Sequence, residues 1–334
     1  MKALLSFLAV IVLVLIVTLG VDVANLHFLF GIIIPYLAFV MFVGGFVYRV
    51  IKWGRSPVPF RIPTTCGQQK SLPWIKQAKI ENPTTALGVI IRMASEIFFF
   101  RSLFRNSKTE LRNDGDGPKL AYGSAKWLWF GSLVFHWSFF IIVVRHLRFF
   151  LEPVPQFLQL VDSIDGMLQI GLPPIYLTDL FFLLAVTFLF LRRVAIPQVK
   201  YISLAADYFP LFMILGIAIS GVLMRYFYRI DIVAVKELAL SLVQLNPVVP
   251  EGIGVIFYIH LFLICALFAY FPTSKLMHMG GIFLSPTRNM ISNNRMVRHI
   301  NPWNPDDLEY HTYAHYEDEY REKMKKAGIP VEKE

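Results

Sequence analysis

The chain has 334 residues, of which 56% are hydrophobic and only 16% are charged, and it contains 30 Phe, 14 Tyr and 6 Trp. A soluble domain usually carries about 25% charged residues, so the composition excludes an ordinary soluble protein and indicates a membrane domain with polar appendages. The net charge is +9, but the basic residues lie in loops between apolar runs, as membrane topology requires. We therefore expect a lipid bilayer and no nucleic acid as a partner.

Six apolar segments have roughly the 20 residues that a helix needs to cross a bilayer. In chain order they are Leu4–Val21, Phe28–Tyr48, Trp127–Leu147, Ile175–Leu191, Tyr208–Tyr226 and Ile253–Phe271. The first resembles a signal peptide, but its apolar run is longer than usual, which favours an uncleaved helix over cleavage near Ala24. The sequence predicts an all-α integral membrane protein with six transmembrane helices.

The basic residues predict which side each loop faces. If Lys2, 49–126, 192–207 and 275–334 face the cytoplasm, these segments hold 27 of the 32 Lys and Arg residues. Such an excess marks the inner side of a prokaryotic cytoplasmic membrane. Both termini are then cytoplasmic.

Two appendages are too long to be simple connectors. In the first, 49–126, the segment Thr84–Lys108 is expected to form a helix that lies on the inner membrane surface or under a partner. In the second, 280–334, an acidic run is followed by a basic run and then by Gly328, which predicts a polar helix. We divide the chain into an N-terminal helix pair (1–48), a cytoplasmic loop with an amphipathic helix (49–126), a four-helix membrane region (127–279) and a cytoplasmic tail (280–334).

The two cysteines are not expected to pair, because Cys66 lies in a basic loop and Cys265 in an apolar run. The sequence contains no C-x-x-C motif, which argues against covalent haem, iron–sulfur clusters and zinc. Any metal centre must therefore be held by histidine.

Four of the eight histidines lie within or at the ends of apolar segments. His136 and His146 belong to the third segment, and His260 and His278 lie in and just after the sixth. Ten helical residues rise about 15 Å and eighteen about 27 Å, so each pair is spread along the membrane normal. The two helices run in opposite directions, which places His136 opposite His278 near the inner face and His146 opposite His260 near the outer face. Imidazole is a common axial ligand of haem iron, so these pairs predict an inner and an outer haem b.

The unequal spacings require an adjustment, and Pro272 is expected to bend or end the sixth helix before His278. A single membrane histidine can instead form a hydrogen bond with a neighbouring helix, but two pairs matched in depth favour ligation. The other four histidines are expected at the surface: His27, His299, His311 and His315.

Two further sets of residues on the outer side are candidates for binding the haem propionates and the quinone. Guanidinium groups suit haem propionates, although they can also simply reach the membrane interface. The candidate arginines are Arg145, Arg148, Arg225 and Arg229. A quinone site also needs a proton acceptor, and three residues that are otherwise ordinary interface residues offer one: Glu152, Tyr176 and Asp179.

The histidine spacings and the segment FPTSKLMH (271–278) resemble the gamma subunit of respiratory nitrate reductase, a family of five-helix, di-haem b, quinol-oxidising subunits. The resemblance covers the second to sixth segments. It implies a five-helix di-haem bundle in which His136 and His278 ligate the inner haem and His146 and His260 the outer one. The extra first helix, the long loop and the longer tail resemble DsrM, the membrane cytochrome b of the Dsr complex associated with dissimilatory sulfite reduction, and the membrane cytochrome of methanogen heterodisulfide reductase.

These resemblances imply an electron-transfer subunit. It would connect menaquinol or menaquinone at the outer haem to a cytoplasmic iron–sulfur partner of the heterodisulfide reductase type, within a complex that has other membrane and outer-side subunits. One alternative is a nitrate reductase gamma-type quinol-oxidising subunit. Alternatives from another class are a non-redox transporter, which the scarcity of acids in the spans disfavours, and a structural anchor, which leaves the paired histidines unexplained.

Overall fold

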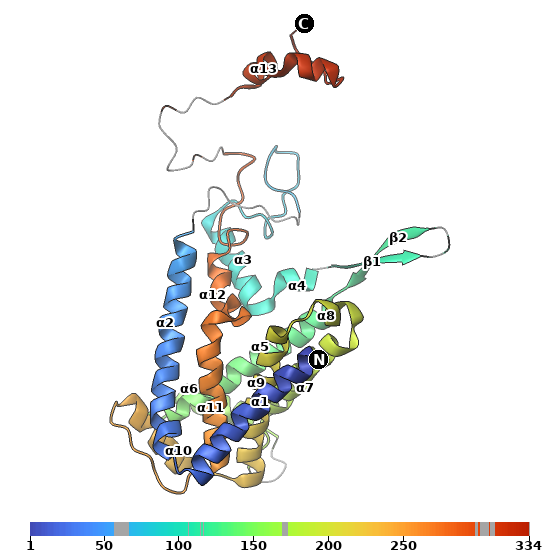
Figure 1. The fold of residues 1–334 in the computed structure, drawn as a ribbon. Helices are drawn as coiled ribbons and strands as arrows, with labels where there is room; N and C mark the ends of the chain where they lie inside the picture. Colours follow the sequence, from blue (N-terminus) through green and yellow to red (C-terminus); the bar gives the residue numbers. More distant parts are fainter. Residues whose placement is uncertain are drawn as a thin grey trace.

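The computed structural model describes residues 1–56, 67–105, 107–113, 115, 117–168, 173–297, 300, 307 and 311–333. Within them the chain forms a bundle of long helices, one β-hairpin and a C-terminal helix (Figure 1). Cys66, His299 and Trp303 lie outside the described residues.

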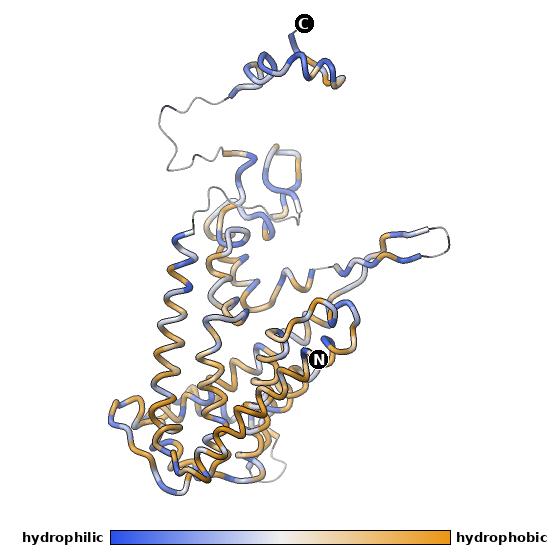
Figure 2. Tube along the Cα trace, in the orientation of Figure 1, coloured by the Kyte–Doolittle hydropathy of each residue, from blue (hydrophilic) through white to orange (hydrophobic). Residues whose placement is uncertain are grey.

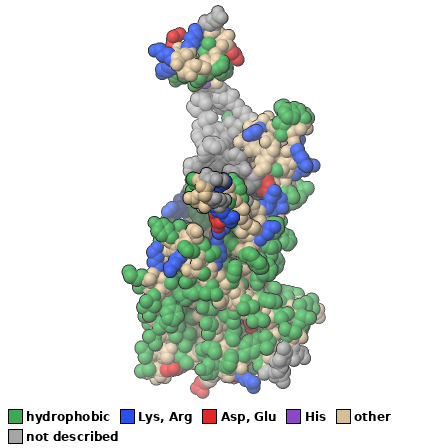
Figure 3. Space-filling model, turned by 90° about the vertical axis from the view of Figure 1, so that its right-hand side faces the viewer, with side chains coloured by type: hydrophobic (Ala, Val, Ile, Leu, Met, Phe, Trp, Pro, Cys, Tyr) green, Lys and Arg blue, Asp and Glu red, His purple; other side chains and the backbone are tan. Residues whose placement is uncertain are grey.

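Five helices in the described part of the chain are long and apolar enough to cross a membrane, and they coincide with the first, second, third, fifth and sixth predicted segments. Hydrophobic residues run along all of them (Figure 2), and their side chains form a broad belt on the molecular surface (Figure 3). The prediction of an all-α, multi-pass membrane protein is confirmed. With their π- and 3₁₀-helical ends, the five helices are α1 (Lys2–Thr18) with η1 (Leu19–Val23), η2 (Leu29–Ile33) with α2 (Ile34–Gly54), α5 (Lys126–His146) with η3 (Leu147–Phe149), α9 (Ala205–Val222) with η4 (Leu223–Tyr228), and α11 (Val255–Tyr270) with η5 (Phe271–Thr273).

The fourth predicted segment is α7 (Leu177–Ala195), a helix of 19 residues. It rises about 28 Å, close to the thickness of a bilayer core. It is more polar than the other five because it has Asp179 in its first turn and Arg192 and Arg193 in its last turn. α7 packs between α5 and α9, so it completes the bundle, and α8 (Pro197–Ile202) joins it to α9.

Segments that the sequence assigns to one side of the membrane lie together at one end of the bundle, here called the His278 end. Lys2 Nζ donates to a carbonyl in the turn between α8 and α9 at 2.9 Å, and Lys275 Nζ lies 2.7 Å from Asp207 Oδ1. α1 therefore begins where α11 ends. We call the opposite end, where α11 begins, the His260 end.

The His278 end carries a cap that differs from the predicted helix Thr84–Lys108. The structure has α3 (Ala86–Phe99) and a short α4 (Arg101–Arg105), because Phe100 between them adopts a left-handed conformation with φ of 49°. Thr85 caps α3 by accepting a hydrogen bond from the Gly88 N–H at 3.1 Å. The predicted helix is therefore too long.

After α4 comes an antiparallel hairpin of β1 (Ser107–Asn113) and β2 (Pro118–Ser124), which the sequence analysis did not predict. Gly115 and Gly117, in the connection, have φ of 96° and 100°, which glycine adopts without the steric cost of a side chain. The run NDGDG at 113–117 was the turn signal for this hairpin.

The remaining elements flank the bundle. At the His260 end, α6 (Gln156–Asp165) follows α5, and α10 (Ile232–Val243) packs Val235 and Leu238 into a core with Val17, Val21 and Tyr258. At the His278 end, η6 (Lys275–Met277), α12 (His278–Gly281) and η7 (Ile282–Leu284) lead to the tail. The tail helix is α13 (Tyr313–Lys326).

Candidate haem site

The four predicted ligands meet in two pairs. The ring centroids of His136 and His278 lie 6.0 Å apart with planes at 89°, and those of His146 and His260 lie 6.4 Å apart with planes at 15°. Each pair joins α5 to α11 or to the segment after it, with one pair toward each end of the bundle. The sequence pairing and the observed pairing are the same.

The helix break reconciles the unequal spacings. α11 ends at Tyr270, ten residues after His260, and Pro272 lies in the 3₁₀ turn η5 that follows. The helical rise from His260 to Tyr270 therefore equals that between His136 and His146. The turns η5 and η6 then carry the chain to His278 without a further long helical rise.

The hydrogen bonds of the four histidines engage the same nitrogen, Nδ1, of each ring. Nδ1 of His136, His146 and His278 lies 2.7, 2.7 and 3.0 Å from a backbone carbonyl three or four residues earlier. A carbonyl only accepts, so Nδ1 carries the proton and the lone pair is on Nε2. Nδ1 of His260 lies 2.9 Å from the Ser220 hydroxyl. Such bonds fix the ring orientation of metal-ligating histidines and raise their basicity.

The ring separations fit two axial ligands on one metal. A metal–imidazole nitrogen bond is about 2.0 Å, and the ring centroid lies about 1.1 Å further along the same line, so two opposed ligands have centroids about 6.2 Å apart. The two pairs lie close to this value, at 6.0 and 6.4 Å. Within the described residues, no cluster of three or more His, Cys, Asp or Glu side chains forms a different metal centre.

Among the described residues, α5 and α11 make few close backbone contacts with each other. α5 packs closely on α7, whereas α11 packs closely on α1, α2 and α9, so the histidine-bearing helices do not pack tightly on each other. Gly221 lets α9 approach His260, because a Cβ there would lie 3.3 Å from the imidazole Cε1. The residues present therefore fit a haem at each pair.

Aromatic side chains cover the His136 pair. The Phe100 ring lies 4.9 Å from the imidazole of His136, edge to face. Two tryptophans of α5 hold the neighbouring backbone, since Trp129 Nε1 donates to the carbonyl of Phe99 at 2.7 Å and Trp137 Nε1 to that of Phe98 at 3.0 Å. The left-handed Phe100 is therefore held against His136.

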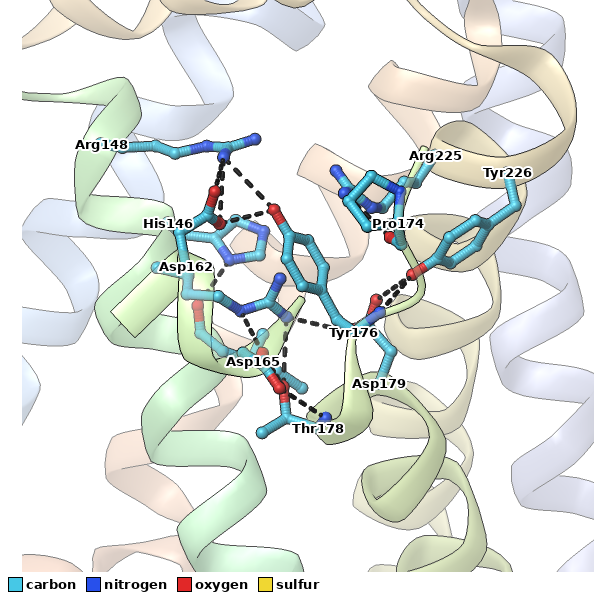
Figure 4. Close-up of polar contacts among 12 residues, drawn as sticks. His146, Arg148, Asp162, Asp165, Pro174, Tyr176, Thr178, Asp179, Arg225 and Tyr226 are labelled. Atoms are coloured by element: carbon cyan, nitrogen blue, oxygen red, sulfur yellow. Dashed lines mark hydrogen bonds and ion pairs between the residues drawn. The ribbon is translucent and has the colours of Figure 1, made fainter. Parts of the chain in front are cut away.

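At the His260 end the structure builds a buried polar network (Figure 4). Arg145, at the end of α5, has Nε 2.8 Å from Asp165 Oδ2 and Nη2 2.7 Å from Asp179 Oδ1. Asp165 also accepts the N–H of Thr178 at 2.9 Å and its hydroxyl at 2.6 Å. Buried charges need such partners, and these bonds hold α6 against α5 and α7.

Tyr176 lies at the centre of the network. Its ring centroid is 3.6 Å from the guanidinium carbon of Arg145 and 3.9 Å from that of Arg225, a cation–π arrangement on both sides. Its hydroxyl donates to Asp162 at 2.5 Å, and Asp162 pairs with Arg148 at 3.2 Å (Figure 4). Tyr176 is only 4% exposed.

Two of the predicted outer residues stand apart from this network. Glu152 is exposed, pairs with Lys236 and lines a cavity of about 400 Å³ beside α10. Arg229 is exposed, with a left-handed φ of 47° after η4. The other five predicted residues lie together, in or directly against Tyr176 and its partners: Arg145, Arg148, Arg225, Tyr176 and Asp179.

Sequence analysis missed several members of the site. Asp162 and Asp165 stand three apart in α6, a spacing that places both on one helical face. Tyr226 accepts the N–H of Tyr176 at 3.0 Å and donates to Asp179 at 3.1 Å. Ser220 is a buried serine in an apolar helix, and this polar residue in a membrane span was the available signal.

Facing imidazole pairs inside a bundle of membrane helices are the arrangement of a membrane cytochrome b. Residues 89–299 match the nitrate reductase gamma subunit family, and the chain belongs to that family. This confirms the resemblance to the family, with a match over the third to sixth predicted segments rather than the second to sixth.

Two relatives share most of the chain. One from Archaeoglobus fulgidus is 44% identical over 287 residues, which cover 84% of this chain and 85% of the relative. One from Archaeoglobus profundus is 40% identical over 280 residues, which cover 82% of each. Each is described as a Hdr-like menaquinol oxidoreductase cytochrome b-like subunit.

Proposed function

We propose that this chain is the di-haem cytochrome b subunit of a respiratory oxidoreductase complex. It transfers electrons between menaquinol or menaquinone and a cytoplasmic iron–sulfur partner of the heterodisulfide reductase type. The observation that carries the proposal is the two imidazole pairs, 6.0 and 6.4 Å between centroids, with every Nδ1 engaged in a hydrogen bond. His136 and His278 hold one haem b, and His146 and His260 the other. Haem iron, when bound, supplies one-electron transfer.

We assign the quinone to the His260 end, where the polar network lies. The names of the two relatives support menaquinol as the donor. Glu152 is exposed beside a cavity and is the proposed proton acceptor. Tyr176 and Asp179 are held in place by several hydrogen bonds, and their proposed role is to shape the site rather than to exchange protons with solvent.

The propionate assignment needs one change. Arg145 is buried and already pairs with two carboxylates, so its proposed role is structural. Arg148 and Arg225, at the edge of the network, and the exposed Arg229 remain the proposed propionate partners.

The orientation and the biological context come from the sequence. The distribution of 27 of 32 basic residues supports a cytoplasmic His278 end and thus a cytoplasmic partner next to the His136 pair. The resemblance to the Dsr cytochrome supports a role in dissimilatory sulfur metabolism.

The haem content tests this function. The purified subunit should hold two haems per chain that acid acetone extracts, measured by the pyridine haemochrome assay. His136→Ala and His278→Ala should each remove the same single haem, because either change deletes one of its two axial ligands. His146→Ala and His260→Ala should each remove the other.

His315→Ala is the matched control, because His315 is exposed on α13 and both haems should remain. One haem or none in the unmodified chain would refute the proposal. Loss of the same haem from His136→Ala and His260→Ala would show that the pairing is wrong.

A further inference from the structure

A basic depression at the His278 end has no part in the haem or quinone sites. It has a volume of about 1050 Å³ and is lined by the segment 70–81, by α4 and by Met296. We call it the basic basin. Its cationic side chains are Lys70, Lys76, Lys79, Arg101 and Arg105.

The basin carries a net positive charge. Among the described residues that line it, Glu81 is the only acidic one, and its Oε1 is shared by Arg101 at 3.1 Å and Arg105 at 2.8 Å. The three lysines are exposed and form no ion pair with any residue that the structure describes: Lys70, Lys76 and Lys79. Three charges are therefore available to a ligand.

Apolar side chains accompany these charges. Trp74 is 79% exposed, Leu72 54% and Met296 49%. Tryptophan, arginine and methionine are enriched in protein interfaces. The segment lies beyond the end of α2, away from the apolar stretches of the long helices (Figures 1 and 2), so contact with a protein explains the exposed Trp74 better than contact with lipid does.

The basin is close to the His136 pair in space. Arg101 follows Phe100, whose ring lies 4.9 Å from His136, and α4 packs Phe104 against Trp129 of α5 at 4.8 Å. One short helix therefore separates a protein bound in the basin from the imidazole. The segment 70–81 precedes the family match at 89–299, whereas Arg101, Arg105 and Met296 lie within it, so the basin joins a segment outside the match to part of the matched region.

We propose that the basic basin docks an acidic surface of the protein that exchanges electrons with the His136/His278 site. This inference rests on the proposed function, and it names both the docking surface and the charge of the partner. Opposite charges accelerate association and make it sensitive to salt, while the exposed Trp74, in the same segment as the three lysines, supplies an apolar contact beside the basin.

The test uses the whole complex, purified through a tag on this chain. The co-purified iron–sulfur subunit is released with salt and titrated back onto the detergent-solubilised cytochrome. The triple variant K70E/K76E/K79E should weaken the apparent Kd at least about tenfold and flatten its dependence on NaCl. Haem content and reduction of both haems by menaquinol should be unchanged, which separates this inference from the function on which it rests.

The matched control is K108E/R112E/K119E on the exposed hairpin, which makes the same change in charge at the same end of the bundle. An unchanged Kd in the basin variant overturns the proposal. An equal loss of affinity in both triple variants also overturns the proposal, because it would indicate a general electrostatic effect rather than a specific docking site. If the basin variant instead loses co-purifying anionic phospholipid and keeps its Kd, the basin binds the membrane surface and the proposal is wrong.

Discussion

Each of the four facing histidines has its Nδ1 hydrogen-bonded, but the acceptors differ. Three donate to backbone carbonyls within four residues. His260 alone bonds to a side chain, the hydroxyl of Ser220 on α9, which donates its own proton to the Gly216 carbonyl at 2.8 Å. The hydroxyl can therefore accept the Nδ1–H, and His260 is the one of these four histidines whose Nδ1 has a side-chain hydrogen-bond partner.

Ser220→Ala should raise the reduction potential of the His146/His260 haem. Loss of the acceptor weakens the imidazole as a donor and so destabilises the ferric state. A hydrogen bond contributes about 0.5–1.5 kcal/mol, which for one electron corresponds to about 20–60 mV. A redox titration followed in the visible spectrum measures this shift.

The control for this change is Ser6→Ala, which removes a buried hydroxyl bonded to the carbonyls of Lys2 and Ala205 at the other end of the bundle. Both potentials should stay the same in this variant. A Ser220→Ala protein with unchanged potentials would show that His260 does not ligate through Nε2 with Nδ1 bonded to the serine.

Among the helices, α2 and the turn after α11 make a close contact that a single methyl group would disturb. A Cβ on Gly45 would lie 2.6 Å from Pro272 Cβ and 2.7 Å from its Cγ. A proline ring cannot rotate away, and small residues of this kind let membrane helices approach. Because Pro272 follows the end of α11 shortly before His278, this contact also positions a proposed haem ligand.

Gly45→Ala should destabilise the protein by about 1–3 kcal/mol, the usual cost of overpacking, and should loosen the His136/His278 haem before the other. Thermal loss of the haem absorbance in detergent follows both effects. Gly44→Ala is the matched control in the same helix, because no atom lies within 4 Å of a Cβ there. Gly44→Ala should leave the stability of the protein equal or slightly higher, since alanine favours a helix by roughly 0.5–1 kcal/mol over glycine. Equal changes in stability from Gly44→Ala and Gly45→Ala would refute this packing argument.

For the molecule as a whole, cysteine labelling can test which end of the bundle faces the cytoplasm. In a Cys66→Ser background, Lys119→Cys on the hairpin should resist a membrane-impermeant maleimide in intact cells and react after permeabilisation. Ser163→Cys, exposed on α6 at the His260 end, should react in intact cells. The opposite pattern would put the His278 end outside and move the proposed partner to that side.

The sequence predicts the spans and the histidine pairs because both depend on local patterns. Apolar runs of bilayer length specify the helices, and the spacing from His136 to His146 fixes their relative height. Pro272 was recognised as a break, but only the structure shows that α11 ends at Tyr270, which makes the two heights equal.

Other features depend on contacts between distant segments, which spacing does not encode. Arg145 was predicted to meet a propionate because it flanks His146, yet it pairs with Asp165, 20 residues further along the chain, in a helix that was not predicted. The break at Phe100 depends on tryptophans of α5 that hold the neighbouring carbonyls. In both cases a tertiary contact determines the local structure.

The ion pair between Arg145 and Asp179 has a consequence for how the chain enters the membrane during its synthesis. α7 is the least apolar of the six long helices, and an isolated carboxylate is costly in lipid. Its partner lies on α5, which is synthesised earlier and packs directly against α7. If the two helices insert together as a hairpin, Asp179 crosses the bilayer boundary already neutralised. The salt bridge therefore favours cotranslational insertion of α7 as a pair with α5 rather than as a single segment.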